Sequence, residues 1–128
     1  MNKKVWLITG CSTGFGRQLA KLVLKLGYKA GVAARNTDDV KDIIADYPDT
    51  AIALKLDVTK TDEVKAAVAA VKQKFGLIDV LVNNAGIGYF GAIEESEEDE
   101  VRRMFEINFW GLANMTKEVR VPSIAVIS

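Results

Sequence analysis

Short apolar runs alternate with longer amphipathic segments along almost the whole chain, and this alternation is the feature that most restricts the fold. Strands that alternate with helices become parallel and are joined by right-handed crossovers. Near-continuous apolar strands are typical of such a sheet, because helices cover both of its faces. The sequence therefore predicts one doubly wound, Rossmann-type α/β unit. The runs that predict strands are residues 4–9, 29–34, 51–58, 77–83 and 123–128.

The segments between these runs carry signals for helix ends. In the first, apolar residues recur at helical spacing and Gly27 follows as a stop. We expect Thr37 and Thr61 to be the N-caps of the second and third helices. Ser96 and Asp99 resemble a capping box that opens a fourth helix, ending near residue 117. In the third helix, one apolar face is predicted from Val64, Val68, Val71 and Phe75.

Composition excludes several classes of function. The 128 residues, 49% of them hydrophobic, fit one domain over residues 1–128. The net charge is zero, without a basic stripe, so nucleic acid is not an expected partner. The absence of histidine excludes a histidine-based triad and argues against a metal site. No signal peptide is recognised, and no stretch approaches the roughly 18 apolar residues of a membrane span. We therefore expect no membrane partner, and Cys11, as the one thiol, cannot form an internal disulfide, which predicts a cytoplasmic protein.

A glycine-rich stretch separates the first predicted strand from the first predicted helix. In this fold, the first strand-to-helix turn is the favoured site for a phosphate group. Gly10 permits the tight turn, Gly14 lets the backbone approach a pyrophosphate, and Gly16 allows close packing of helix and strand. The helix N-terminus supplies free N–H groups. The alternative is a tight turn without a ligand, but the placement favours a dinucleotide site.

The position after the second strand bears on which dinucleotide is bound. An acidic residue there usually binds the ribose 2′-hydroxyl, but this chain has Ala34, followed by Arg35. Without the acid there is no repulsion of a 2′-phosphate, and a guanidinium can pair with that phosphate. The sequence therefore favours NADP(H) over NAD(H), the alternative being that Arg35 is an ordinary solvated arginine.

Four motifs in a fixed order resemble those of the short-chain dehydrogenase/reductase family. Residues 9–16, TGCSTGFG, resemble its TGxxxGxG motif, and residues 56–59, LDVT, resemble its adenine-contacting segment. Residues 83–86, NNAG, and residues 107–111, INFWG, resemble its NNAG motif and the helix segment that bears its asparagine. The resemblance covers about residues 4–119 and implies strand order 3-2-1-4-5. It also implies NAD(P)-dependent hydride transfer between a carbonyl and an alcohol.

The resemblance assigns roles to individual residues. It implies that Asp57 holds the adenine amino group, that Asn83 shapes the adenine-ribose side, and that Ser12 and Phe15 lie along the phosphates. Without the family, Asp57 could equally cap the turn that follows it. The residues expected to bind the cofactor are Gly10, Ser12, Thr13, Gly14, Phe15, Gly16, Arg35, Asp57, Val58, Asn84, Ala85 and Gly86.

Asn108 is the catalytic-site candidate within these residues. It falls on a helical stripe of apolar residues, where a buried amide needs hydrogen-bond partners. A structural role bonded to the backbone and the family's role overlap, because the family's asparagine kinks the helix and holds a water of the proton relay. The stripe consists of Val101, Met104, Phe105, Leu112 and Met115.

The tyrosine and lysine that such chemistry needs are not found in this sequence. None of the three tyrosines is followed four residues later by lysine, and Ser128 falls one position short of the family's serine. Compared with the family pattern, we expect an incomplete, truncated domain, and oligomerisation of this domain is doubtful. Three hypotheses follow: a portion of an NADP-preferring oxidoreductase, a catalytically inactive NADP(H)-binding fragment, or a non-functional remnant. The substrate, a small carbonyl or alcohol compound, is not specified further, although Tyr89 and Phe90 hint at an apolar one.

Overall fold

The computed structural model describes residues 4–85, 98–120 and 123–126, and these contain a parallel sheet of five strands. The order β3-β2-β1-β4-β5 confirms the predicted doubly wound fold. Strand β2 spans the whole of its predicted run, whereas β1, β3 and β4 are shorter than theirs. The strands are β1 (Val5–Ile8), β2 (Lys29–Ala34), β3 (Ala51–Lys55), β4 (Val80–Asn83) and β5 (Ser123–Val126).

The central strand β1 fixes the register of the sheet. Val5 pairs with Lys29 of β2, and Trp6 pairs with Val80 of β4. Asp79 extends this pairing, since its backbone amide donates to the Val5 carbonyl at 2.8 Å and its carboxylate accepts from the Val5 amide at 2.8 Å. All four pairings are parallel, so the carboxyl ends of the described strands lie along one edge. Loops that follow different strands are therefore neighbours at this edge.

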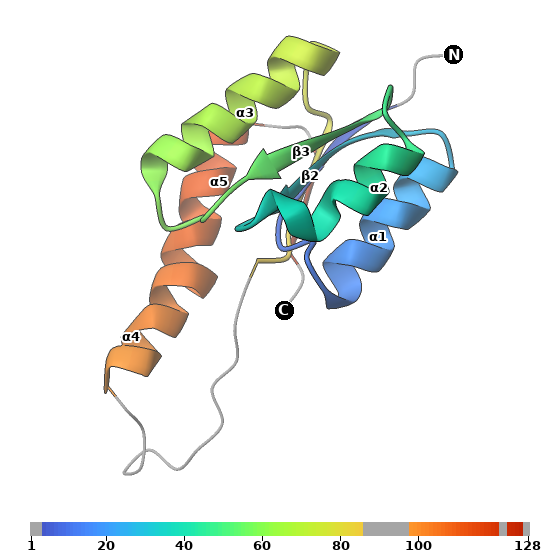
Figure 1. Ribbon diagram of the computed structural model, residues 1–128. Helices are drawn as coiled ribbons and strands as arrows, with labels where there is room; N and C mark the ends of the chain where they lie inside the picture. Colours follow the sequence, from blue (N-terminus) through green and yellow to red (C-terminus); the bar gives the residue numbers. More distant parts are fainter. Residues whose placement is uncertain (1–3, 86–97, 121–122, 127–128) are drawn as a thin grey trace.

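Helices cover both faces of the sheet (Figure 1). Helices α1 (Gly14–Lys25) and α2 (Lys41–Asp46) lie on one face, and α3 (Thr61–Phe75) and α5 (Leu112–Val119) lie on the other (Figure 1). Each face has its own apolar core. Val64, Val68 and Val71 of α3 are buried as predicted, whereas Phe75 is only partly buried. Apolar burial at about 25 cal/mol per Å² makes these two layers the main source of stability.

Two predicted helix caps are wrong. The second helix begins as a 3-10 turn, η1 (Thr37–Val40), and its cap is Asn36, whose side chain accepts from the Asp38 amide at 3.0 Å. Asparagine has a side-chain carbonyl at the right reach for this bond, so it replaces Thr37 in that role. Helix α3 starts at Thr61, with Lys60 in the cap position and no side-chain cap.

The predicted long helix is continuous but changes its winding in the middle. Helix α4 (Glu98–Phe105) leads into a π-helical segment, η3 (Glu106–Gly111), and then into α5. A π turn contains more residues than an α turn, so it rotates the side chains that follow it relative to those before it. The predicted stripe is wrong in part: Asn108 and Phe105 are exposed, and the buried positions are Ile107, Gly111, Met115 and Val119.

Candidate cofactor site

The glycine loop joins β1 to α1, as the sequence predicts. Gly10 and Gly14 have φ angles of 67° and 65°, in the left-handed region that favours glycine. Helix α1 begins at Gly14, and the Thr13 side chain forms no cap hydrogen bond. No acidic residue lies in the first turn of α1. The amide groups at the start of α1 are thus left for solvent or for an anion.

Gly16 is the point at which the helix meets the rest of the site. A Cβ atom there would lie well inside 3.0 Å of both the Gly10 carbonyl oxygen and the Asn84 side-chain nitrogen. Asn84 donates that nitrogen to the Gly10 carbonyl at 3.0 Å. A Cβ on Gly10 would itself meet Ala85 at 3.0–3.1 Å. These contacts confirm that Gly16 permits close packing, and they give Asn84 a structural role within the site.

Thr9 is a site residue that the sequence reasoning missed. It is 1% exposed, and its hydroxyl accepts from the amides of Asn84 and Ala85, each at 2.9 Å. The same hydroxyl donates to the Val82 carbonyl at 3.3 Å. One side chain therefore holds the end of β1 against the segment that follows β4. A hydroxyl placed at the end of an apolar strand was the available signal, because a buried hydroxyl needs partners.

The opposite wall of the site is formed by the residues that follow β2. Arg35 is exposed immediately after Ala34, at the carboxyl edge. The next residues are tied to α1 by Arg17, whose guanidinium donates to the Asp39 carbonyl at 2.9 Å and pairs with the Asp42 carboxylate. No sequence pattern indicates this connection, because residues 17 and 42 belong to different helices. It fixes the segment after Arg35 relative to the start of α1.

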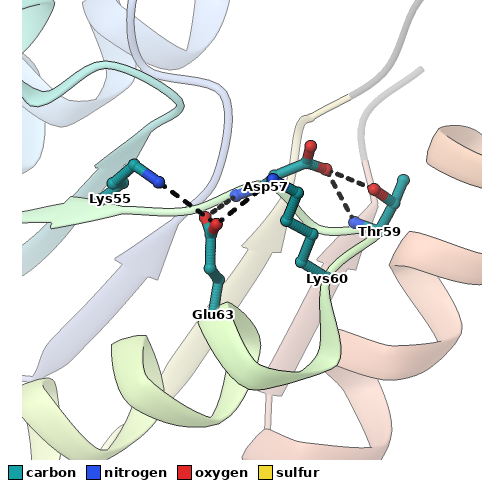
Figure 2. Close-up of polar contacts among 5 residues, drawn as sticks. All are labelled: Lys55, Asp57, Thr59, Lys60 and Glu63. Atoms are coloured by element: carbon teal, nitrogen blue, oxygen red, sulfur yellow. Dashed lines mark hydrogen bonds and ion pairs between the residues drawn. The ribbon is translucent and has the colours of Figure 1, made fainter.

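Asp57 follows β3 and is held from two sides (Figure 2). One of its carboxylate oxygens accepts from the Thr59 amide at 3.0 Å and from the Thr59 hydroxyl at 2.6 Å. This confirms the turn-capping interpretation of Asp57 for that oxygen. In Figure 2 the other oxygen points away from Thr59. The backbone amide of Asp57 donates to Glu63 at 3.0 Å.

Electrostatics keep Asp57 ionised. Partial burial is the largest influence and by itself raises the pKa of Asp57. The hydrogen bonds from Thr59 and the charges of Lys60 and Arg35 together outweigh burial, so the pKa lies below its usual value. Arg35 is thus within electrostatic reach of Asp57, although 22 positions separate them in the sequence. The parallel sheet brings the two predicted adenosine-binding residues to the same edge.

The π-helical segment lies against the residue after Asp57. A Cβ on Gly111 would meet Val58 Cγ2 at 2.5 Å, so the helix backbone lies directly on Val58, which is 5% exposed. Asn108 occupies the middle of this segment, consistent with a residue at a helix distortion. Asn83 is also buried, and its amide donates to the Thr116 hydroxyl at 3.4 Å. These contacts give Val58 and Asn83 packing roles.

An open cleft of about 400 Å³ extends from Asp57 toward α4. Its walls combine acidic and basic side chains with one apolar residue, so it offers no uniform charge to a ligand. Because Asp57 and Thr59 belong to it, the cleft continues the candidate site. The lining residues are Asp57, Thr59, Asp99, Arg102, Arg103, Glu106 and Ile107.

Several predicted residues are placed at the site edge, and others lie outside the described residues. Ser12 is partly buried, whereas Thr13 and Phe15 are exposed, with Phe15 at 57%. Gly86, Ser96, Tyr89, Phe90 and Ser128 lie outside the described residues. Among the residues that are described, no group of three or more acidic or cysteine side chains could hold a metal ion. In the same ranges, no helix has the length and apolar character that crossing a membrane requires.

Comparison with known proteins defines the class. The sequence model of the short chain dehydrogenases matches residues 4–122, and the chain belongs to this family of oxidoreductases. A short-chain dehydrogenase from Streptomyces avermitilis superposes with a TM-score of 0.94 at 39% identity, covering 100% of this chain and 50% of its own. The family match and the shared fold thus agree with the resemblance seen in the sequence.

Two related structures contain nicotinamide cofactors. A 3-ketoacyl-(acyl-carrier-protein) reductase from Brucella melitensis, complexed with NADH, has a TM-score of 0.86 at 38% identity over 91% of this chain and 49% of its own. An alcohol dehydrogenase from Thermococcus sibiricus, complexed with 5-hydroxy-NADP, has a TM-score of 0.88 at 33% identity, covering 93% of this chain and 52% of its own. This chain also spans only 37–48% of the length of the first four curated relatives it matches.

Proposed function

We propose that this chain binds NADP(H) at the carboxyl edge of its sheet and supplies the cofactor site for hydride transfer between NADP(H) and a carbonyl or alcohol. The observation that carries the proposal is the start of α1, where the glycine loop leaves the first amides without a side-chain cap or an acidic neighbour. Such a helix N-terminus binds an anion well. The close approach at Gly16 and the hydrogen bond from Asn84 to Gly10 hold the loop in place.

Each wall of the site suits one part of the cofactor. The pyrophosphate is placed over the start of α1, beside Ser12, Thr13 and Phe15. The adenine lies near Asp57, whose ionised carboxylate accepts a hydrogen bond from the amino group. Arg35 pairs with the 2′-phosphate, because no acid stands at Ala34 to repel it. When bound, the nicotinamide donates or accepts the hydride.

A second candidate function is cofactor binding without catalysis in this chain itself. No tyrosine of the 128 residues is followed four positions later by lysine. A phenol with a pKa near 10 transfers protons poorly at neutral pH unless a nearby cation lowers that pKa. Asn108 is the remaining candidate for the catalytic site, and it lies in the π-helical segment. On this proposal, the chain binds NADPH but does not oxidise it. The substrate, a cytoplasmic location and the oligomeric state stay predictions.

Titration of NADPH and NADH into the purified chain tests cofactor binding. Intrinsic fluorescence of Trp6 and Trp110 and a thermal-unfolding series provide two independent readouts. We expect a cooperative transition that NADPH shifts upward, because a ligand that binds only the folded state stabilises it. Absence of both saturation and a thermal shift would refute the proposed binding. Absence of any cooperative transition would support the non-functional remnant.

The 2′-phosphate assignment has its own test. We expect Arg35→Ala to weaken NADPH binding about tenfold or more, the typical scale for a charge-assisted hydrogen bond, and to change NADH binding little. The matched control is Lys72→Ala, an exposed cation in the last turn of α3, far from the carboxyl edge. Equal losses for NADPH and NADH would contradict the role of Arg35. Oxidation of NADPH by ketones, followed by the loss of NADPH absorbance, then separates catalysis from binding alone.

A further inference from the structure

Glu63 connects helix α3 to the end of strand β3. It lies in the first turn of α3, and its carboxylate points toward the end of β3 (Figure 2). One oxygen accepts from the Asp57 amide at 3.0 Å, and the other accepts from Lys55 Nζ at 3.2 Å. Lys60 Nζ lies 3.8 Å from that second oxygen. The Glu63 side chain is 18% exposed, so it is the least exposed member of these ion pairs.

The hydrogen bond from the Asp57 amide to Glu63 is the contact that positions Asp57. Lys55 and Lys60 are 67% and 57% exposed, and ion pairs of that kind contribute little. The Asp57 amide, in contrast, is part-buried and lies just beyond the last residue of β3. Thr59 fixes the Asp57 carboxylate, and Glu63 fixes its backbone. The backbone amide of Asp57 is therefore held by the first turn of α3, and its carboxylate is held by the β3–α3 connection.

We propose that Glu63 is a positioning residue for adenine recognition, acting through the backbone of Asp57. This inference rests on the proposed function, in which the Asp57 carboxylate accepts the adenine amino group. A hydrogen bond to that amino group requires the carboxylate oxygen at a defined place. Glu63 sets that place because it holds the amide from which the Asp57 side chain extends. It does not itself touch the cofactor.

A purely structural role for Glu63 makes a different prediction. A carboxylate in the first turn stabilises the helix whatever ligand is bound, and its loss would lower stability alone. Adenine recognition can be read separately by comparing NADPH with the analogue that carries hypoxanthine in place of adenine. Hypoxanthine has a carbonyl where adenine has the amino group, so the group at that position cannot donate to Asp57. The part of the ratio of dissociation constants that Asp57→Ala abolishes measures this contact.

The experiment uses the full 128-residue chain and three Glu63 variants. In the unsubstituted chain we expect NADPH to bind about tenfold more tightly than the hypoxanthine analogue. Glu63→Ala removes the acceptor, and Glu63→Asp keeps the charge but shortens the reach, so both should reduce the ratio to about two- to threefold. Glu63→Gln retains an oxygen acceptor for the amide and should keep the ratio near tenfold.

Two further variants complete the test. Asp57→Ala should bring the ratio close to one, and Asp62→Ala, an exposed acid in the same turn of α3, should leave it unchanged. If Glu63→Ala fails to fold, the ratios of Glu63→Asp and Glu63→Gln still test the positioning role, because only the first is expected to fall. Unchanged ratios in the Ala and Asp variants, with lower stability, would overturn the positioning role. Failure of the unsubstituted chain to bind either compound would overturn the proposed function, and this inference with it.

Discussion

Replacing Gly16 by alanine is the most direct perturbation of the candidate site. The new Cβ would lie well inside 3.0 Å of the Gly10 carbonyl oxygen and the Asn84 side-chain nitrogen, and 3.0 Å from the Gly10 carbonyl carbon. Two of these neighbours are backbone atoms of the same loop, so they cannot rotate away as a side chain can. The loop must move relative to α1, and the hydrogen bond between Asn84 and Gly10 must lengthen or break.

The expected cost follows from these contacts. Overpacking in a closely packed region costs about 1–3 kcal/mol, and loss of one hydrogen bond costs about 0.5–1.5 kcal/mol. Alanine in a helix recovers up to about 1 kcal/mol relative to glycine. The free energy of unfolding should therefore fall by about 1–3 kcal/mol. Because the shifted loop also carries the start of α1, NADPH binding should weaken as well.

Urea denaturation monitored by tryptophan fluorescence measures this change. With a slope of about 1–3 kcal/mol per M urea, the midpoint should fall by roughly 1 M. Gly14 is the matched control, since it has positive φ but an added Cβ would meet nothing within 4 Å. Asparagine tolerates left-handed φ, so Gly14→Asn should be milder than Gly14→Ala. Gly16→Asn should instead be worse than Gly16→Ala. An unchanged midpoint for Gly16→Ala would refute the reasoning.

Three further predictions concern buried or partly buried groups. Burial raises the pKa of Cys11 to about 12, so native protein should resist thiol reagents until urea unfolds it, and rapid native labelling would contradict this. Because the thiol of the unfolded chain ionises at about pH 8.5, its contribution to stability is full below that pH and should decrease as pH rises toward 12. Thr9→Val keeps the shape of the side chain but leaves two amides without their acceptor, so the free energy of unfolding should fall by about 1–3 kcal/mol in urea titrations. A change below about 0.5 kcal/mol, the size expected of a neutral surface substitution, would count against the role of the Thr9 hydroxyl as acceptor. Asp79→Ala removes the acceptor of the Val5 amide and should lower the melting temperature, whereas Asp49→Ala, in an exposed turn, should not.

Much of the fold was accessible from the sequence because its signals are local. Apolar runs and helical spacing act over neighbouring turns, and they predicted the strands and most of the helices. The left-handed conformations of Gly10 and Gly14 were also predictable, because glycine reaches them without strain. The strand order came from the family resemblance, and the structure confirms it. The sequence by itself thus determined the elements, the glycine loop and the class of ligand to expect.

The tertiary structure decided which residues meet at the site. Thr9 bonds to Asn84 across 75 positions, and Gly10 bonds to the same residue across 74. The tertiary structure also contains the π-helical segment, in which Asn108 is exposed and does not join the predicted buried stripe. Spacing in the sequence cannot reveal such features, because they depend on which strands become neighbours and how closely backbones pack. The glycines in the sequence indicated a ligand site after the first strand. Only the packed sheet showed which distant residues hold the glycine loop in place.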